Sequence, residues 1–238
     1  MRKYHVVLFF LLCIFTTAVQ ARFFVGIEGG YLGSATYQDL SKDGTLFVVA
    51  KPSIIPSAFS DSLKGFNTSL SIGTESFFGD YFGIRLDFLA GYNQMTQHFD
   101  SIKAQFNLIN TSLYFDFLVN FLKSSHVDLG FIGGIGMDVY YRLNYLKEIN
   151  IDDFDMLPMS DFLSNFIQAY SLYTNSALTS RVLMNFAGRV GFTALIANHH
   201  RLEFVAKLPI ASISSFPLIG GNMNLANVTF NVGYRFIF

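Results

Sequence analysis

The last eleven residues of the chain alternate between two kinds of side chain. Apolar or aromatic residues occupy every second position, at Val228, Phe230, Val232, Tyr234, Phe236 and Phe238. The residues between them are mostly small or polar. Because successive side chains of an extended chain point to opposite faces, this segment is predicted to be a β-strand with one apolar and one largely polar face. The apolar face runs to Phe238, where a soluble domain would usually have polar sequence.

The chain is rich in apolar residues, yet its sequence predicts no membrane-spanning helix beyond the N-terminal segment. Hydrophobic residues make up 51% of the sequence and charged residues 14%, with a net charge of -1. A spanning helix needs about 20 consecutive apolar residues, and no such run follows the N-terminus. The hydrophobicity is instead distributed by alternation, which is typical of strands that face lipid on one side and a polar lumen on the other. The near-neutral charge argues against a nucleic-acid partner, which would require a basic surface.

Residues 1–21 are predicted to be a secretory signal peptide, because two basic residues precede a short apolar core. Cleavage is expected after Ala21. The alternative, an uncleaved membrane anchor, would require a longer apolar run. Cys13, the only cysteine, lies in the apolar core, so the mature chain would have no thiol chemistry. Residues 22–238 are then expected to form a single domain.

Period-two alternation recurs along the whole mature chain and predicts about eight strands. They are expected near residues 23–31, 66–75, 82–92, 109–121, 127–139, 182–196, 201–210 and 228–238. The predicted fold is all-β: a transmembrane, antiparallel, up-and-down β-barrel. A missed hairpin would raise the number of strands to ten, which is also an even number, as bacterial barrels have.

The predicted connections alternate in length. Those after the second, fourth and sixth strands are a few residues long, whereas the others, at 32–65, 93–100, 142–180 and 211–221, are long or irregular. This asymmetry indicates short periplasmic turns and long extracellular loops, with both ends of the barrel domain on the periplasmic side.

The charged residues of the predicted strands fall on the inward face. They are Glu28, Glu75, Arg85, Asp87, Asp116, Asp128, Asp138, Arg189, Arg201, Glu203, Lys207 and Arg235. Both signs occur, and a barrel of about eight strands is roughly filled by its own side chains. We therefore expect a structural network of ion pairs across the lumen, since buried charges require partners. The alternative is a narrow conducting pore.

The predicted extracellular loops contain apolar residues that call for an explanation. In the third loop, Met159, Phe162, Leu163, Phe166, Ile167 and Tyr170 have the spacing of an amphipathic helix. The first loop contains a further apolar stretch at 47–50. One interpretation is that the loops pack on each other and cap the barrel. The other is a hydrophobic site at the outer mouth, for a lipidic ligand or a partner protein.

No constellation of residues indicates catalysis. His98, Asp100 and Ser101 are close in sequence, but a triad depends on spatial geometry. The acidic group Asp152, Asp153 and Asp155 matches no calcium-loop spacing. The sequence therefore predicts a protein that is not an enzyme, with no catalytic, cofactor-binding or metal-binding residues.

The C-terminal segment resembles the terminal strand of Gram-negative outer-membrane β-barrel proteins, which close on a C-terminal Phe preceded by aromatic residues at alternate positions. The resemblance implies that Phe230, Val232, Tyr234, Phe236 and Phe238 form the signal read by the barrel-assembly machinery. It also implies an outer-membrane location, with membrane lipid and lipopolysaccharide as surroundings. The sequence lacks the His-x-Ser strand motif of the lipid A deacylase barrels.

The signal peptide, the alternation and the Gly-Tyr-Arg-Phe-Ile-Phe ending are together most similar to the Helicobacter-type outer membrane proteins. That similarity implies a surface protein, since some members are adhesins and some are porins. Many of those adhesins are far longer than this chain. We expect an integral barrel whose loops interact with a host or envelope protein or maintain the envelope. A narrow porin or a transporter for a hydrophobic solute is the alternative, and an outer-membrane lipid-modifying enzyme ranks third.

Overall fold

The computed structural model describes residues 21–39, 47–49, 63–99, 102–143, 182–214 and 222–238. They form nine strands: β1 (Arg22–Asp39), β2 (Phe47–Val49), β3 (Leu63–Phe78), β4 (Phe82–Phe99), β5 (Ile102–Lys123), β6 (Val127–Arg142), β7 (Val182–Ile196), β8 (His200–Ser214) and β9 (Asn222–Ile237). Within these ranges, no helix has the length and hydropathy to cross a membrane.

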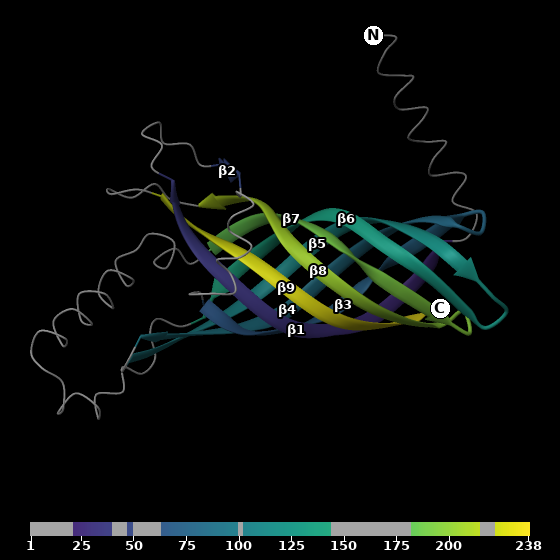
Figure 1. The fold of residues 1–238 in the computed structure, drawn as a ribbon, viewed down its shortest axis with the longest axis horizontal. Coiled ribbons are helices and arrows are strands. Elements are labelled where there is room, and N and C mark those ends of the chain that lie inside the picture. The colour runs from purple at the N-terminus through teal and green to yellow at the C-terminus, as the bar shows by residue number, and fades with distance from the viewer. Residues whose placement is uncertain (1–20, 40–46, 50–62, 100–101, 144–181, 215–221) are drawn as a thin grey trace, which may run out of the picture.

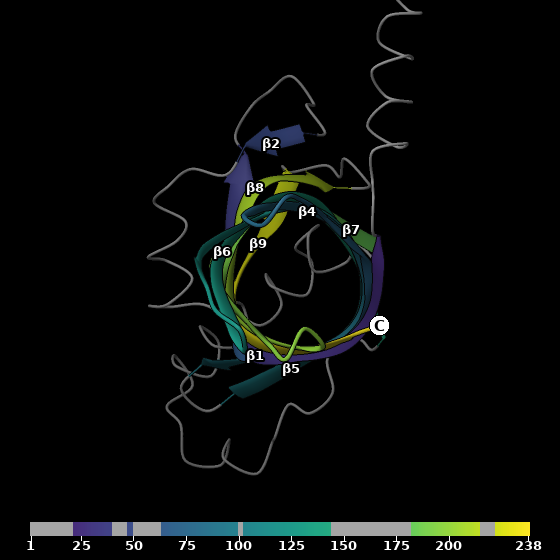
Figure 2. The same cartoon turned by 90° about the vertical axis from the view of Figure 1, so that its right-hand side faces the viewer.

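Eight long strands close into an antiparallel barrel, which confirms the predicted fold. Each strand pairs with its neighbours in the order β8-β7-β6-β5-β4-β3-β1-β9, and β9 pairs with β8 to complete the ring. Figure 1 shows the barrel from the side, and Figure 2 shows the ring of strands from one end. Three hairpins and the C-terminal end of β9 lie together at one end (Figure 1). By the rule for bacterial barrels, this end is periplasmic.

The strands are strongly staggered around the barrel. A path along directly paired residues runs through Arg22, Glu75, Arg85, Asp116, Gly134, Arg189, Lys207 and Thr229, and returns to β1 at Leu32. Leu32 is ten residues beyond the starting point, Arg22. A stagger of this kind requires strands tilted by roughly 35–45° from the barrel axis. The path also shows why charged residues of six strands become neighbours.

The two faces of each strand meet different surroundings. Outward side chains are apolar and exposed, as at Leu70 and Ile135, which are 66% and 65% exposed. Inward side chains are buried, and most of them are polar or charged. This is the reverse of a soluble sandwich, and it fits a barrel with lipid outside and a filled lumen inside.

Apolar clusters occupy the lumen toward both ends. Leu32, Leu63, Met95, Phe106, Leu108, Tyr140 and Leu183 form the extracellular cluster. At the periplasmic end, Phe24, Leu195 and Ile237 form a second one. Many of the charged side chains lie between these clusters, so polar and apolar layers alternate along the lumen.

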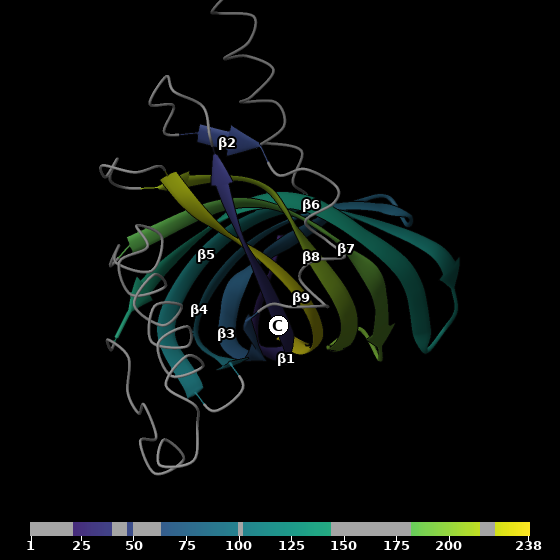
Figure 3. The same ribbon diagram turned by 60° about the vertical axis from the view of Figure 1, so that its left-hand side comes forward.

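The strands are longer than the alternation predicts, and the prediction of a loop at 93–100 is wrong. β4 continues to Phe99 and pairs there with Ile102 on β5, so the two strands form one long hairpin. The 47–50 stretch, predicted as part of a loop, contains β2, which pairs with the outer end of β8. In Figure 1, β2 lies toward the end of the barrel opposite the C-terminus, and Figure 3 shows it outside the ring of long strands. Main-chain pairing needs no side-chain alternation, which is why these extensions are not visible in the sequence pattern.

The seam between β8 and β9 is shorter than the other seams. It extends only from His200 and Phe236 to Lys207 and Thr229, and none of the described residues pair across it beyond that point. Pro209 follows on β8, and proline has no main-chain N–H to donate. The ladder between β7 and β8 also shifts its register beside Pro209. The extracellular halves of β8 and β9 therefore separate.

Candidate functional site

The lumen contains all twelve charged residues that the sequence places on the inward face. Each is buried, and the most accessible, Asp128, is 9% exposed. The alternation of side chains along each strand explains this placement, because every second side chain points to the lumen. The chemistry of the site depends on how these charges are paired.

Eight of these residues form a compact group that we call the central network. It consists of Arg85, Arg189, Lys207 and Arg235 with Glu28, Asp87, Asp116 and Glu203. Four positive and four negative groups balance each other. The side chains come from β1, β4, β5, β7, β8 and β9, so the network crosses the whole lumen.

Arg85 joins opposite walls of the barrel. Its Nε donates to Oδ2 of Asp116 at 2.9 Å, and its Nη1 donates to Glu203 on β8. Its Nη2 also donates to Glu203, at 3.3 Å. Such charge-assisted, two-point bonds are the strongest that side chains make.

Asp87 lies between two further guanidinium groups. Arg189 Nη2 and Arg235 Nη2 each donate to Oδ2 of Asp87 at 2.8 Å. Arg235 also contacts Glu203 and Glu28. One carboxylate thus links β4, β7 and β9.

Glu28 connects the network to the extracellular half of the lumen. It forms an ion pair with Lys207, and Asn231 Nδ2 donates to its Oε1 at 3.1 Å. The carboxylate therefore has several partners, as a buried charge requires.

Aromatic rings pack against the cations of the network. Arg85 and Arg235 each lie 5.7 Å from the centre of the Phe24 ring. Tyr114 is 4.4 Å from the Arg189 guanidinium, and its hydroxyl donates to Asp138 at 2.8 Å. Cation–π attraction adds to the ion pairs where the groups are desolvated. The sequence analysis did not predict a role for these rings, although the alternation along their strands places them on the inward face.

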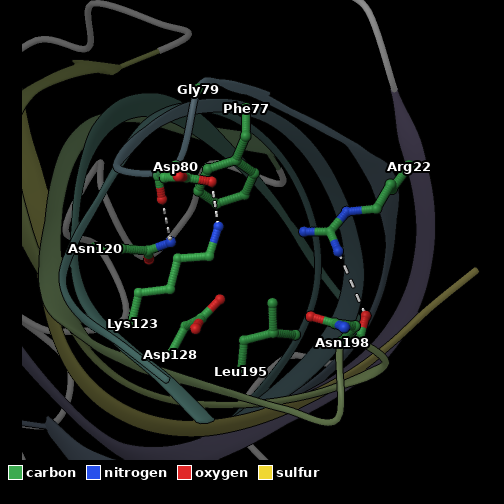
Figure 4. Close-up of a pocket in the computed structure, with 9 residues that line it drawn as sticks. All are labelled: Arg22, Phe77, Gly79, Asp80, Asn120, Lys123, Asp128, Leu195 and Asn198. Carbon is green, nitrogen blue, oxygen red and sulfur yellow. Dashed lines mark hydrogen bonds and ion pairs between the residues drawn. The ribbon is translucent and has the colours of Figure 1, made fainter. Parts of the chain in front are cut away.

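A small vestibule opens at the periplasmic end. It encloses about 250 Å³, and Figure 4 shows that Lys123, Asp128 and Arg22 converge on it. Lys123 forms an ion pair with Asp80 at its rim. Leu195 lines the vestibule and also belongs to the periplasmic apolar cluster. The vestibule therefore meets an apolar layer before it reaches the central network.

A second charge group lies beside the vestibule. Arg22 and Arg201 both donate to Oε1 of Glu75, at 2.7 and 3.0 Å. Arg201 also donates to the Thr193 hydroxyl at 3.0 Å. Two positive groups share one carboxylate here, whereas the central network contains equal numbers of positive and negative groups.

On the extracellular side of the central network, uncharged polar residues line the lumen. Asn67 and Asn93 are direct partners across β3 and β4, and both are buried. Their Oδ1 atoms have no hydrogen-bond partner among the described residues, and the same is true of Asn231 Oδ1. Buried acceptors of this kind are usually satisfied by ordered water.

The structure describes only some of the other residues that the sequence singles out. Val232, Tyr234 and Phe238 face outward and are exposed on β9 or just after it, and Phe230 and Phe236 are partly buried. The apolar patch of the third loop (Met159, Phe162, Leu163, Phe166, Ile167 and Tyr170) lies outside the described residues, as do Asp100 and Ser101 and the acidic group at 152–155. His98 lies on β4 and not in a loop.

A closed, tilted barrel with an apolar outer surface and an ion-paired lumen defines an integral outer-membrane β-barrel protein. Within that class, the chain belongs to the Helicobacter outer membrane protein family, whose family model matches residues 69–238. This match confirms the resemblance inferred from the C-terminal sequence and the outer-membrane location. A search of curated proteins gave no match.

Several solved outer-membrane structures are similar in fold. Neisserial surface protein A is 12% identical, with a TM-score of 0.46, over 92% of this chain and 99% of that one. The outer membrane protein OprG from Pseudomonas aeruginosa is 16% identical, with a TM-score of 0.43, over 92% and 97%. Ail, the attachment invasion locus protein of Yersinia pestis, is 13% identical, with a TM-score of 0.35, over 90% and 99%.

Proposed function

We propose that the protein is a closed membrane anchor, without catalytic activity, that presents its extracellular segments at the cell surface. The central network supports this proposal most directly. None of its eight side chains is more than 9% exposed, and apolar clusters lie on both sides of it. A barrel filled in this way contributes a rigid scaffold, and its interactions depend on its loops.

The arrangement of the network also supports a closed lumen. An ion that crosses it must separate charge-assisted hydrogen bonds, such as those of Arg85 with Asp116 and Glu203. Removing one partner of a buried pair typically costs about 3–5 kcal/mol. Since the pairs share partners across six strands, opening a path would disturb several of them at once.

A solute-flux assay tests the closed state. Proteoliposomes containing the purified barrel should swell no faster in an isosmotic sugar solution than protein-free liposomes. A gel-shift assay for heat-modifiability would establish that the barrel is inserted and folded. Rapid swelling, at a rate that scales with the amount of folded protein, would contradict the proposal.

The surface role has its own test. The apolar residues of the third loop motivate it, because such residues in an extracellular segment suggest a binding surface. The triple substitution of Phe162, Phe166 and Tyr170 by Ser should weaken binding of the barrel to host cells or to envelope proteins. Unchanged binding, with unchanged surface levels, would remove these residues from the proposed interaction.

A transporter for a hydrophobic solute is the second candidate function. The separation of β8 and β9 beyond Lys207 and Thr229 favours it, because a lateral opening could pass apolar molecules without crossing the central network. A disulfide between Leu208→Cys and Val228→Cys should lock the separated strands and abolish uptake of such a solute. The pair Ala206→Cys and Phe230→Cys, at positions that already face each other, is the matched control. Uptake that survives the first disulfide would exclude this route.

A further inference from the structure

A groove lies on the lipid-facing surface of the barrel, outside the lumen. It has a volume of about 330 Å³ and extends over β5, β6, β7 and β8. Phe121, Phe192 and Phe204 line it and are 53%, 58% and 50% exposed. Leu129, Ala194 and Leu202 also line it, together with Gly130, Thr193 and Glu203, which are buried residues of the inward face. The groove is therefore apolar and open toward the membrane.

The strand register creates this groove. Ala194 is directly paired with Leu129 on one side and with Leu202 on the other. One row further toward the extracellular end, Phe192 is paired in the same way with Phe131 and Phe204. A small residue therefore lies beside a row of three aromatic rings, and the difference in side-chain volume leaves a hollow over Ala194.

A β-bulge completes the rim. The ladder between β5 and β6 shifts its register between Asn120 and Leu122, so Phe121 and Leu122 are both exposed. The Phe121 ring lies 4.8 Å from that of Phe131, which lies 5.1 Å from that of Phe192. Bulges of this kind redirect side chains, and here the result is a continuous aromatic wall.

The groove lies close to the periplasmic edge of the membrane. The hairpin turns that join β5 to β6 and β7 to β8 are neighbours, since Ala197 N donates to the His126 carbonyl at 2.9 Å. Leu129 lies two residues after the start of β6, and Ala194 two residues before the end of β7. The groove thus begins two residues from these strand ends, at the depth of the periplasmic leaflet.

We propose that this groove binds one acyl chain of a phospholipid from the periplasmic leaflet. Acyl chains surround this surface, and an apolar hollow loses dispersion contacts unless it is filled. For comparison, an engineered apolar cavity of about 150 Å³ is large enough to bind benzene. The groove has more than twice that volume, so it can hold a segment of acyl chain.

His200 provides a partner for the headgroup. It is the outward residue next to Leu202 on β8, and it is exposed at the periplasmic edge. Its Nδ1 lies 2.8 Å from the Tyr234 hydroxyl. When that hydroxyl donates to Nδ1, the neutral ring carries its proton on Nε2 and can donate to a phosphate oxygen. An acyl chain in the groove places its headgroup at this level.

Native mass spectrometry of the purified barrel with added phosphatidylglycerol tests the proposal. Wild-type protein should retain one phospholipid at collision energies that remove all others. Ala194→Phe, which fills the groove, should lose it. Ala90→Phe, the same change at an exposed, lipid-facing alanine on β4, should retain it. Equal retention by the two variants would overturn the proposal, as would a dimer that Ala194→Phe dissolves, because a second copy would then occupy the groove.

The same assay distinguishes a phospholipid from a free fatty acid as the source of the acyl chain. His200→Ala should reduce retention of phosphatidylglycerol and leave retention of a free fatty acid unchanged. If the wild-type barrel retains the fatty acid as firmly as the phospholipid and His200→Ala has no effect, the assignment to a phospholipid is wrong.

A fluorescence measurement tests the same proposal without a substitution that fills the groove. The chain contains no Trp, so the variants Phe204→Trp and Phe88→Trp each carry a single probe, the first in the groove and the second on the opposite wall. Brominated phosphatidylglycerol should quench the groove probe at a mole fraction about threefold lower than the probe on the opposite wall, roughly the effect of one additional buried methylene. Identical quenching curves would contradict a specific site.

Discussion

Arg189 holds Asp116 through two parallel hydrogen bonds that cross an intervening strand. Nε of Arg189 donates to Oδ1 of Asp116 at 2.5 Å, and Nη2 donates to Oδ2. The two residues lie on β7 and β5, and Gly134 of β6 is paired with both. A Cβ at Gly134 would overlap with the Asp116 carboxylate. The absence of a side chain at Gly134 is therefore what allows the ion pair to span β6.

Gly134→Ala should destabilise the barrel by about 2–4 kcal/mol, because it displaces a carboxylate that bonds two arginines. The adjacent Gly133 faces the membrane, and a Cβ there would meet no atom within 4 Å. Gly133→Ala should therefore change stability by less than about 1 kcal/mol. Guanidinium unfolding in lipid vesicles, followed by circular dichroism, measures both. Equal effects of the two substitutions would show that Gly134 is not required for the ion pair.

The energy of the Arg189–Asp116 pair can be measured by a double-mutant cycle. Arg189→Met and Asp116→Leu should each cost about 3–5 kcal/mol, since each leaves buried charges without a partner. The double variant should be less destabilised than the sum of the two, by about 1–3 kcal/mol. Additive losses in the same unfolding assay would mean that the pair contributes no coupling.

The turn between β7 and β8 offers a stabilising substitution. Ala197 and Asn198 have φ values of 50° and 62°, and His199 N donates to the Ile196 carbonyl at 3.2 Å. These are features of a type I′ turn, which favours Gly or Asn. Left-handed backbone costs a residue with a Cβ roughly 1–2 kcal/mol, so Ala197→Gly should stabilise the barrel by about 1 kcal/mol. Asn198→Gly should have a smaller effect, because Asn tolerates this conformation. A lower unfolding midpoint for Ala197→Gly would refute this explanation.

The sequence predicts the orientation of side chains well but not their partners. The alternation of side chains alone places Arg85, Asp116 and Glu203 inside the lumen, because the face on which a side chain lies depends only on its position along the strand. The bonds between them depend on the ten-residue stagger and on the closure of β8 against β9, which are properties of the whole ring. The alternation therefore cannot show that Arg85 reaches Glu203 across the lumen.

Strand ends are a second limit of the sequence pattern. The alternation near Tyr92 fades before β4 ends at Phe99, since the hairpin partner on β5 continues the main-chain ladder whatever the side chains. The groove over Ala194 was likewise not predicted, because it depends on which residues on β6 and β8 lie beside it.

The C-terminal Phe has a predicted role in assembly that can be separated from lipid contact. Phe238 packs against Phe23 and Phe236, with ring centres 5.8 and 5.1 Å apart. If it is part of the assembly signal, Phe238→Ala should reduce the amount of folded, heat-modifiable barrel in the outer membrane several-fold. Phe82→Ala is the matched control, because Phe82 and Phe238 are both 62% exposed. Equal loss in both variants would indicate a general need for exposed aromatic residues.

Single-channel recording in planar lipid bilayers tests the closed lumen most directly. The central network and the apolar clusters on either side predict a flat current trace after insertion of folded, heat-modifiable wild-type barrels. Stable, discrete conductance steps that scale with the amount of inserted protein would show that the lumen conducts and would contradict this account.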